Sequence, residues 1–157
     1  MRNTKKSFLW IVSILKRHQI PFVILGGLAA RIYGSPRPLN DIDIDIPVKY
    51  FEVILKDIKP YIIYGPDHYI DAAWDEQVIT LNYEGQEIDI GGGDTVKIYD
   101  AKTGEWRDMP TDFENVERKE VFGLVVPVIS REHLVEYKSM LDGNHQQFDI
   151  KAILGDH

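Results

Sequence analysis

The chain has 157 residues, 44% of them hydrophobic and 27% charged, and its formal net charge is −7. This length and composition predict an ordinary globular domain with its own core and exclude a low-complexity protein. The negative charge argues against an extended nucleic-acid surface, which would need a basic excess. The sequence has no cysteine, which excludes disulfides and thiolate metal sites and fits a cytoplasmic protein.

The N-terminal part alternates between helical and extended patterns. Residues 4–18 carry apolar side chains at helical spacing, which predicts an amphipathic helix too short to cross a bilayer. Residues 22–25 predict a short strand and residues 28–33 a short second helix. The prolines within residues 34–40 predict a loop, because proline fits neither a helix interior nor a central strand. We expect no membrane segment.

Residues 41–46 alternate aspartate with isoleucine. Successive side chains of a strand point to opposite faces, so Asp41, Asp43 and Asp45 share one face and the isoleucines form the other. Carboxylates about 7 Å apart along one face repel one another unless a cation lies between them. Magnesium takes carboxylate oxygens and keeps positions open for substrate phosphates. The alternation therefore predicts a strand with a core face and a divalent-metal face.

A glycine pair, Gly26-Gly27, separates the strand at residues 22–25 from the helix at residues 28–33. Glycine lets the backbone approach a ligand closely, and the free N–H groups at a helix N-terminus attract an anion. We interpret this turn as a phosphate-binding element, with a plain strand-to-helix turn as the alternative. A phosphate-binding turn beside metal-binding carboxylates is typical of proteins that handle nucleotides.

The middle of the chain turns from a helical to an extended pattern. Apolar residues at helical spacing predict a helix at residues 51–58. We expect a turn at residues 65–67 and a flexible exit at the glycines of residues 91–93. The strands of this region are predicted at residues 61–64, 69–74, 78–83 and 86–90.

The C-terminal part predicts two helices after a region of loops. Residues 94–118 predict loops with short strands, and residues 121–126 predict a further strand. Ser130 is a good N-cap for a helix that runs to about residue 141. A last helix covers roughly residues 146–154.

These features resemble a known family. Gly26-Gly27, a spacer of thirteen residues and Asp41-Ile42-Asp43 are similar to the signature of the DNA polymerase β-like nucleotidyltransferase superfamily. Within it, the chain most resembles the small antibiotic nucleotidyltransferases of the lincosamide type and the nucleotidyltransferases of toxin–antitoxin systems. The short lincosamide enzymes also carry an Asp-Ile-Asp-Ile-Asp run.

The resemblance implies both a fold and a reaction. The implied fold is an α/β (α+β) nucleotidyltransferase fold, with a mixed sheet flanked by helices. We expect one domain over residues 1–157, with a core of about residues 1–127 and a helical segment of about residues 130–155. The implied reaction moves a nucleoside monophosphate from an NTP, expected to be ATP, to a hydroxyl and releases pyrophosphate. It would require Mg²⁺ or Mn²⁺.

The resemblance also implies a set of catalytic carboxylates. Asp41 and Asp43 would bind metal, and Asp89, between two isoleucines of the strand at residues 86–90, would bind metal or act as general base. Two alternatives stay open at this point. Asp43 and Asp45 could form the metal pair instead, and Glu87 lies on the same strand face as Asp89.

Four further residues are implied in nucleotide binding. Gly26 and Gly27 would hold phosphates through backbone N–H groups, Arg37 would reach the triphosphate, and Lys138 corresponds to a helical lysine near the nucleotide. The similar families often have Arg-x-Thr where this chain has Arg37-Pro38-Leu39, so the threonine hydroxyl is absent here. Asp149 lies in a Phe-Asp-Ile stretch like one near the end of the lincosamide enzymes.

The acceptor is not defined by these residues. We expect a small hydroxylated molecule of the antibiotic kind, and the short relatives suggest a homodimer. One alternative is the modification of RNA or protein within a toxin–antitoxin system. Another is a non-catalytic nucleotide-binding module with the same fold.

Overall fold

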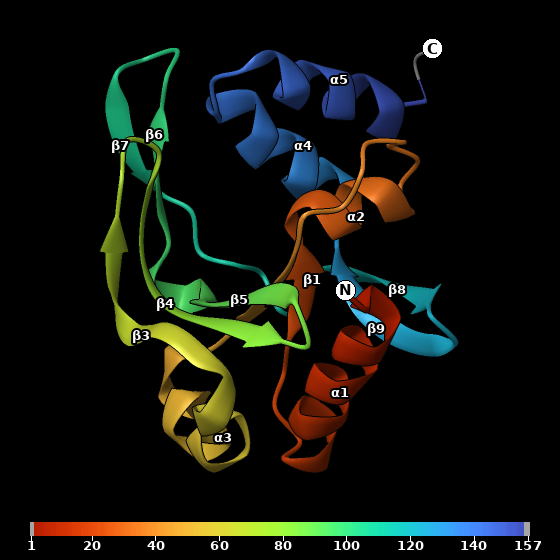
Figure 1. Ribbon diagram of the computed structural model, residues 1–157. Helices are drawn as coiled ribbons and strands as arrows, with labels where there is room; N and C mark the ends of the chain where they lie inside the picture. The colour runs from red at the N-terminus through yellow and green to blue at the C-terminus, as the bar shows by residue number, and fades with distance from the viewer. Residues whose placement is uncertain (1, 156–157) are drawn as a thin grey trace.

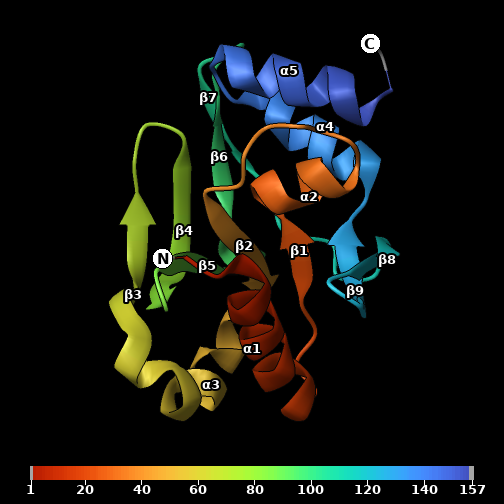
Figure 2. The ribbon, with the colours of Figure 1, turned by 45° about the vertical axis from the view of Figure 1, so that its right-hand side comes forward.

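The computed structural model describes residues 2–155, and it shows a mixed sheet with helices on both of its faces (Figures 1 and 2). The helices are α1 (Thr4–Arg17), α2 (Gly26–Ile32), α3 (Phe51–Ile58), α4 (Arg131–Met140) and α5 (Asn144–Ile153). The strands are β1 (Val23–Leu25), β2 (Asp41–Ile46), β3 (Ile62–Ile70), β4 (Trp74–Tyr83), β5 (Gln86–Gly92), β6 (Lys97–Asp100), β7 (Glu105–Asp108), β8 (Val116–Val121) and β9 (Leu124–Ile129). Short 3-10 turns lie at Val48–Tyr50, Lys59–Tyr61 and Gly93–Thr95.

The acidic strand β2 lies in the middle of the sheet. The strand order is β7-β6-β4-β5-β2-β1-β9-β8, and β3 pairs with β4 outside this path. The pairs β2–β5 and β1–β9 are parallel, and the remaining pairs are antiparallel. A central strand bonded on both edges holds its side chains in a fixed register. The backbone of β2 is therefore a rigid support for its aspartates.

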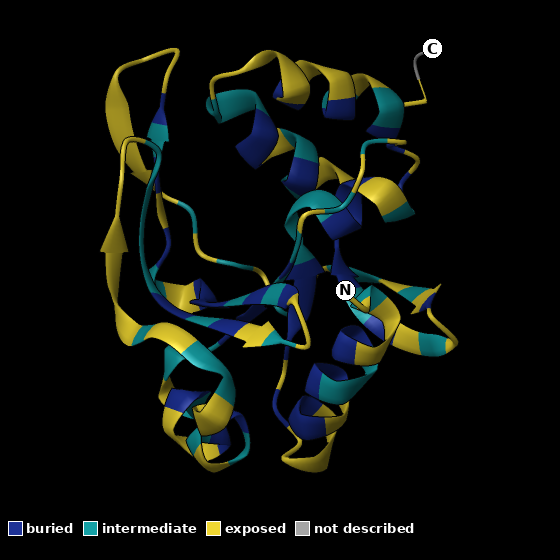
Figure 3. Ribbon diagram, viewed as in Figure 1, coloured by how far each residue is buried: buried dark blue, intermediate teal, exposed yellow. Residues whose placement is uncertain are grey.

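The two faces of β2 have different environments. Ile42, Ile44 and Ile46 are fully buried within the hydrophobic core. Helices α1 and α3 cover this face, whereas α2, α4 and α5 lie on the other side of the sheet (Figures 1 and 2). Burial is concentrated in β1, β2 and β5, and it decreases toward β3 and β7 (Figure 3). The side chains of the opposite, acidic face point away from the core.

Most predicted elements are confirmed, with boundary shifts of a few residues. Helix α2 begins at Gly26, so the glycine pair forms its first residues. Ser130 caps α4 as predicted, because its hydroxyl accepts a hydrogen bond of 3.2 Å from the backbone N–H of His133. Among the described residues, no helix has the length and apolar composition needed to cross a membrane.

Four local predictions are wrong. The predicted strand at residues 69–74 contains the turn between β3 and β4, because the Asp71 carboxylate accepts hydrogen bonds from the backbone N–H groups of Ala73 and Trp74 and ends the extended backbone. The predicted turn at residues 65–67 lies inside β3, where register shifts against β4 absorb the irregularity, and an edge strand tolerates Pro66. The predicted flexible exit is ordered, because Gly91 and Gly92 are buried in β5. The predicted strand at residues 121–126 is broken by a turn at Phe122 and Gly123, both with positive φ, between β8 and β9.

Candidate active site

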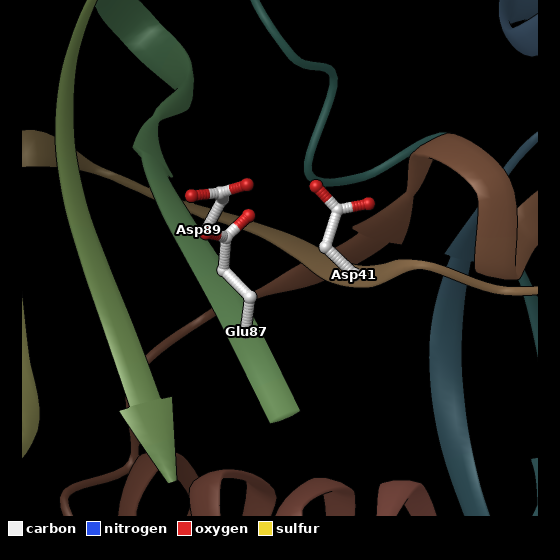
Figure 4. A group of neighbouring side chains, drawn as sticks. All are labelled: Asp41, Glu87 and Asp89. Carbon is white, nitrogen blue, oxygen red and sulfur yellow. The ribbon is translucent and has the colours of Figure 1, made fainter. Parts of the chain in front are cut away.

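Two adjacent parallel strands bring the predicted carboxylates together. Asp41 on β2 lies opposite Glu87 on β5, and Asp43 lies opposite Asp89. One carboxylate oxygen from each of Asp41, Glu87 and Asp89 lies within 4.8 Å of the other two (Figure 4). Oxygen ligands at this separation can share a hard divalent cation. Glu87, which the sequence offered as an alternative to Asp89, therefore belongs to the same group of carboxylates as Asp89.

Asp43 lies against the glycine turn. Gly26 has φ +66°, and a Cβ atom at that position would lie 2.1 Å from Oδ2 of Asp43. Only glycine fits there, because the conformation is left-handed and the space is filled by the carboxylate. A Cβ atom at Gly27 would meet only Leu39, at an ordinary distance of 3.7 Å. The first glycine of the pair thus allows the turn to approach the acidic strand.

Asp45 has a different setting from the other two aspartates of β2. Its side chain is buried, and its Oδ2 accepts a hydrogen bond of 2.5 Å from the Thr111 hydroxyl. A Cβ atom at Gly91 would lie 2.4 Å from Oδ1 of Asp45, which explains why glycine occupies this position of β5. Asp45 is thus packed and hydrogen-bonded within the protein.

The carboxylates of this face have raised pKa values. Loss of hydration and then repulsion from Asp41 and Asp89 hold the pKa of Asp43 well above its ordinary value. Loss of hydration, opposed by a hydrogen bond from Thr80 and reinforced by Asp41, raises the pKa of Asp89 to about 7. Burial, opposed by the hydrogen bond from Thr111, raises the pKa of Asp45 to about 6. A group of acids that resist ionising together is a group that a cation would stabilise.

A cavity of about 660 Å³ opens above the carboxylates. Its floor is formed by β2 and β5, and its walls come from β3, β4 and α4. This volume falls in the range of small-molecule and cofactor sites. The described residues that line it are Leu25, Gly26, Asp41, Asp43, Asp45, Tyr69, Asp71, Trp74, Glu76, Val78, Thr80, Glu87, Asp89, Gly91, Tyr137 and His145.

Helix α4 contributes a tyrosine to the glycine turn. The backbone N–H of Gly26 donates a hydrogen bond of 2.9 Å to the hydroxyl of Tyr137, whose side chain is 5% exposed. Burial and the charge of Asp43 raise the pKa of Tyr137, so this hydroxyl keeps its proton. The amide that the sequence assigns to phosphate thus already has an oxygen partner, which can in turn donate its own proton into the cavity.

Solved structures provide a comparison for this arrangement. A proposed nucleotidyltransferase from Thermotoga maritima matches with a TM-score of 0.65 and 20% identity, over 86% of this chain and 84% of that chain. The lincosamide adenylyltransferase LnuA, with bound lincomycin, matches with a TM-score of 0.63 and 16% identity over 100% of both chains. ANT(2″)-Ia in complex with adenylyl-2″-tobramycin matches with a TM-score of 0.58 and 12% identity, over 96% of this chain and 87% of that chain.

The chain has the nucleotidyltransferase fold. The fold predicted from the sequence resemblance is thereby confirmed. No family model and no curated protein matches the sequence.

Two residues that the resemblance assigns to the nucleotide, Arg37 and Lys138, lie outside the described cavity lining. Arg37 forms two hydrogen bonds, of 2.8 and 2.7 Å, with the carboxylate of Asp149 on α5. Lys138 on α4 is 4% exposed, and its Nζ donates to the same carboxylate over 3.1 Å. The Ser35 hydroxyl also donates to Asp149, over 2.6 Å. Among the described residues, Arg37 and Lys138 are therefore partners of a buried aspartate and are absent from the cavity lining.

The sequence analysis did not single out several residues that line the cavity, among them Asp71, Glu76 and Tyr137. Burial and then the charges of Asp45 and Asp89 raise the pKa of Glu76 to about 8. The alternation of β4 contains a signal for Glu76, because Glu76, Val78 and Thr80 share one strand face. The signal can be read only if the strand is known to begin before Glu76, whereas the predicted strand began at residue 78.

Proposed function

We propose that this protein is a divalent-metal-dependent nucleotidyltransferase that moves a nucleoside monophosphate from an NTP, expected to be ATP, to a small hydroxylated acceptor. The observation that carries the proposal is the group of carboxylates on β2 and β5 at the floor of a cavity, directly beside the Gly26 turn. The solved structures of this fold include antibiotic adenylyltransferases, which supports nucleotidyl transfer.

The carboxylates fit Mg²⁺ or Mn²⁺. Their ligand atoms are all hard oxygens, three of them within 4.8 Å of one another, and their raised pKa values show that the charges are not balanced within the protein. Asp41, Asp43 and Asp89 would hold the metal, with Glu87 in reach. Asp45 is the weaker alternative to Asp41, because Thr111 occupies one of its oxygens. When bound, the metal would neutralise charge on the triphosphate and on the oxygens that attack and leave.

The residues of the chain would then position the reactants. In the reaction, the acceptor oxygen forms a bond to the α-phosphorus. The bond between that phosphorus and the oxygen that bridges the α- and β-phosphates breaks. Pyrophosphate leaves, and the hydroxyl proton passes to a carboxylate. Asp89 is the candidate for this proton, because it faces the cavity and the Thr80 hydroxyl fixes one of its oxygens at 2.7 Å.

The alternatives receive less support. Among the described lining residues there is no lysine or arginine, which does not suit the backbone of an RNA acceptor. A non-catalytic module would have no need for the full set of carboxylates beside the glycine turn. A homodimer stays a prediction.

The test is a transfer assay with NTP labelled at the α-phosphate. The assay contains Mg²⁺ and, as acceptors, the two antibiotics found with the similar structures, lincomycin and tobramycin. We expect labelled product with the wild type and a loss of at least about 100-fold with Asp43→Asn, since electrostatic stabilisation is commonly of this size. Transfer by Asp43→Asn at the wild-type rate would contradict the proposal.

A further inference from the structure

Three described residues of the cavity lining carry a hydroxyl group: Tyr69, Thr80 and Tyr137. The Thr80 hydroxyl donates to Asp89 over 2.7 Å, and the buried Tyr137 accepts the backbone N–H of Gly26. Tyr69 lies near the end of β3 and is 41% exposed, so its phenol group is not held in the core. A cavity proposed to transfer nucleotides to hydroxyls therefore contains an accessible hydroxyl of its own chain.

The Tyr69 hydroxyl is paired with a carboxylate that can take its proton. It donates a hydrogen bond of 2.8 Å to Oδ2 of Asp71, in the turn between β3 and β4. Oδ1 of Asp71 accepts hydrogen bonds of 2.8 and 2.7 Å from the backbone N–H groups of Ala73 and Trp74. Although partial burial opposes them, these bonds hold the pKa of Asp71 below its ordinary value, so the carboxylate is ionised. A fixed carboxylate within hydrogen-bond reach of a hydroxyl has the geometry of a general base.

The wall that carries Tyr69 continues into the floor of the cavity. Tyr69 lies opposite Glu76 in the pairing of β3 with β4. A Cβ atom at Gly91 of β5 would lie 3.4 Å from Oε2 of Glu76 and 2.4 Å from Oδ1 of Asp45 on β2. The side chains of β3 and β4 on this face thus adjoin those of the acidic strand.

The Tyr69 hydroxyl lies within the electric field of these carboxylates. Its hydrogen bond to Asp71 and loss of hydration raise the pKa of Tyr69, and the charges of Asp89 and Glu76 raise it further. Such charge interactions decline with distance, so the hydroxyl lies near the floor where the metal would bind. A raised pKa keeps the phenol protonated at neutral pH, so transfer to its oxygen requires a base for the proton.

We propose that the protein also transfers a nucleoside monophosphate to its own Tyr69. The phenol oxygen of Tyr69 forms a bond to the α-phosphorus of the bound NTP. The bond between that phosphorus and the oxygen that bridges the α- and β-phosphates breaks, and pyrophosphate leaves. The phenol proton passes to the Asp71 carboxylate, and the product is a phosphodiester between Tyr69 and the nucleoside. This inference rests on the proposed function, because it uses the same NTP and the same metal-binding carboxylates.

The modification would regulate the site that makes it. Tyr69 and the floor carboxylates line one cavity of about 660 Å³, so a nucleotide attached to Tyr69 would occupy space that an incoming NTP or acceptor needs. A small acceptor already in the cavity would compete with Tyr69 for the NTP. The protein would therefore label itself, and become inactive, chiefly when no acceptor is present.

The experiment measures self-labelling in the absence of any acceptor. Wild-type protein is incubated with Mg²⁺ and each α-labelled NTP in turn, and mass spectrometry of the intact chain and of its peptides locates the label. We expect one nucleoside monophosphate per chain, attached to Tyr69, and no label in EDTA. The labelling rate per molecule should not depend on protein concentration, because the hydroxyl and the carboxylates line the same cavity.

Two variants and a matched control test the residues. Tyr69→Phe should remove the label, whereas Tyr64→Phe should be labelled at the wild-type rate. Tyr64 is the matched control, because it is 39% exposed, its ring centroid lies 6.3 Å from that of Tyr69, its hydroxyl donates to the His68 carbonyl, and it is absent from the described cavity lining. Asp71→Asn should slow labelling by about 100-fold or more, because asparagine keeps an oxygen for the backbone N–H groups but cannot take the phenol proton.

A mixture of two variants separates self-labelling from the labelling of a second molecule. Asp43→Asn keeps the target tyrosine but lacks a proposed metal ligand, whereas Tyr69→Phe keeps the metal ligands but lacks the target. Neither variant should acquire label, alone or in the mixture. Label on the Asp43→Asn chain in the mixture would overturn transfer within one chain.

Nucleotide binding distinguishes failure of this inference from failure of the proposed function. Titration calorimetry measures the binding of α,β-methylene-ATP with Mg²⁺ to the wild type and to Tyr69→Phe. Metal-dependent binding by the wild type without self-labelling, or undiminished labelling of Tyr69→Phe, would overturn the inference and leave the proposed function standing. A wild type that binds no nucleotide in the presence of Mg²⁺ would overturn both.

Discussion

At the scale of single residues, the site depends on how closely the glycine turn approaches the acidic strand. Strand alternation places Asp41, Asp43 and Asp89 on the faces opposite the core isoleucines without knowledge of the fold, and the family resemblance implies them as site residues. The sequence cannot predict that Gly26 lies against the carboxylate of Asp43, because this contact joins two elements. For the same reason the role of Tyr137, 111 positions from Gly26, was not visible in the sequence.

The first prediction concerns the two glycines. Gly26→Ala should lower transfer activity by at least about tenfold and destabilise the fold by about 1–3 kcal/mol, because the methyl group would collide with Asp43 and the φ of +66° is strained for alanine. Gly27→Ala is the control, and it should change stability little, since its methyl group would meet only Leu39 at 3.7 Å. Activity assays and chemical denaturation of both variants check this prediction. Equal effects of the two substitutions would contradict it.

The second prediction concerns the hydroxyl of Tyr137. Tyr137→Phe keeps the ring packing but leaves the Gly26 N–H without its 2.9 Å partner, so stability should fall by about 1 kcal/mol. Binding of Mg²⁺ with nucleotide should weaken, because the variant also removes a donor that faces the cavity. Thermal denaturation with and without nucleotide measures both effects. A variant with wild-type nucleotide affinity would show that the hydroxyl only supports the turn.

At the scale of elements, the chain links its C-terminal helices to the loop before β2 through one buried aspartate. Asp149 is fully buried, and it receives Arg37 and Ser35 from the loop and Lys138 from α4. The sequence suggests a nucleotide role for Arg37 and Lys138 because their types match those of the similar families. It contains no signal for their shared partner, which lies more than a hundred positions from Arg37.

The third prediction is that Asp149→Asn destabilises the protein by about 3–5 kcal/mol, because Lys138 would become a buried charge without its carboxylate. The pKa of Asp149 is lowered by Arg37, Ser35 and Lys138 against the effect of burial. Its stabilisation is therefore fully present above the unfolded pKa and is lost as the pH falls through the lower, folded pKa. The gap between wild type and variant should narrow below about pH 4.

Urea denaturation between pH 3 and pH 7 measures that gap. Glu84→Gln provides the control, because it removes an exposed ion pair with Lys6 and should change stability little at any pH in this range. A constant difference between wild type and Asp149→Asn across this range would contradict the role assigned to the carboxylate.

The helices and strands of regular pattern could be predicted from the sequence, and the irregular ones could not. Strand β2 and helix α1 show clear alternation or helical spacing over their whole length, so local pattern decides them. Strand β3 contains Gly65-Pro66, which suggests a turn unless the pairing with β4 is known. Gly91 and Gly92 likewise suggest a loop, whereas the structure uses the first of them to make room for Asp45.

At the scale of the whole molecule, the cavity brings many like charges together in a protein that is already negative. The raised pKa values of Asp45, Asp89 and Glu76 are about 6, 7 and 8. A carboxyl group whose folded pKa is raised makes the folded state bind more protons than the unfolded state. Such a carboxyl group therefore lowers the stability of the folded state as the pH rises from the group's pKa in the unfolded state through its pKa in the folded state.

The fourth prediction follows from this sign. In the presence of EDTA, the unfolding free energy should fall by about 2 kcal/mol or more between pH 5 and pH 8, since each unit of pKa shift corresponds to about 1.4 kcal/mol. Mg²⁺ should reverse the loss, and its effect should increase over the same pH range. Thermal melts at fixed ionic strength measure this dependence. A metal-free protein that is more stable at pH 8 than at pH 5 would contradict the charge arrangement.

The most direct test of the central claim is a thermal melt of wild type and Asp41→Asn/Asp43→Asn with Mg²⁺ and each NTP in turn. Ligand at a hundredfold its dissociation constant should stabilise the wild type by about 2.7 kcal/mol, and only when metal is present. The double variant should melt no lower than the wild type without ligand, because it relieves repulsion, yet show no shift with metal and nucleotide. Two results would contradict the assignment of this site. In one, none of the NTPs raises the melting midpoint of the wild type in the presence of Mg²⁺. In the other, metal and nucleotide raise the midpoint of the double variant as much as that of the wild type.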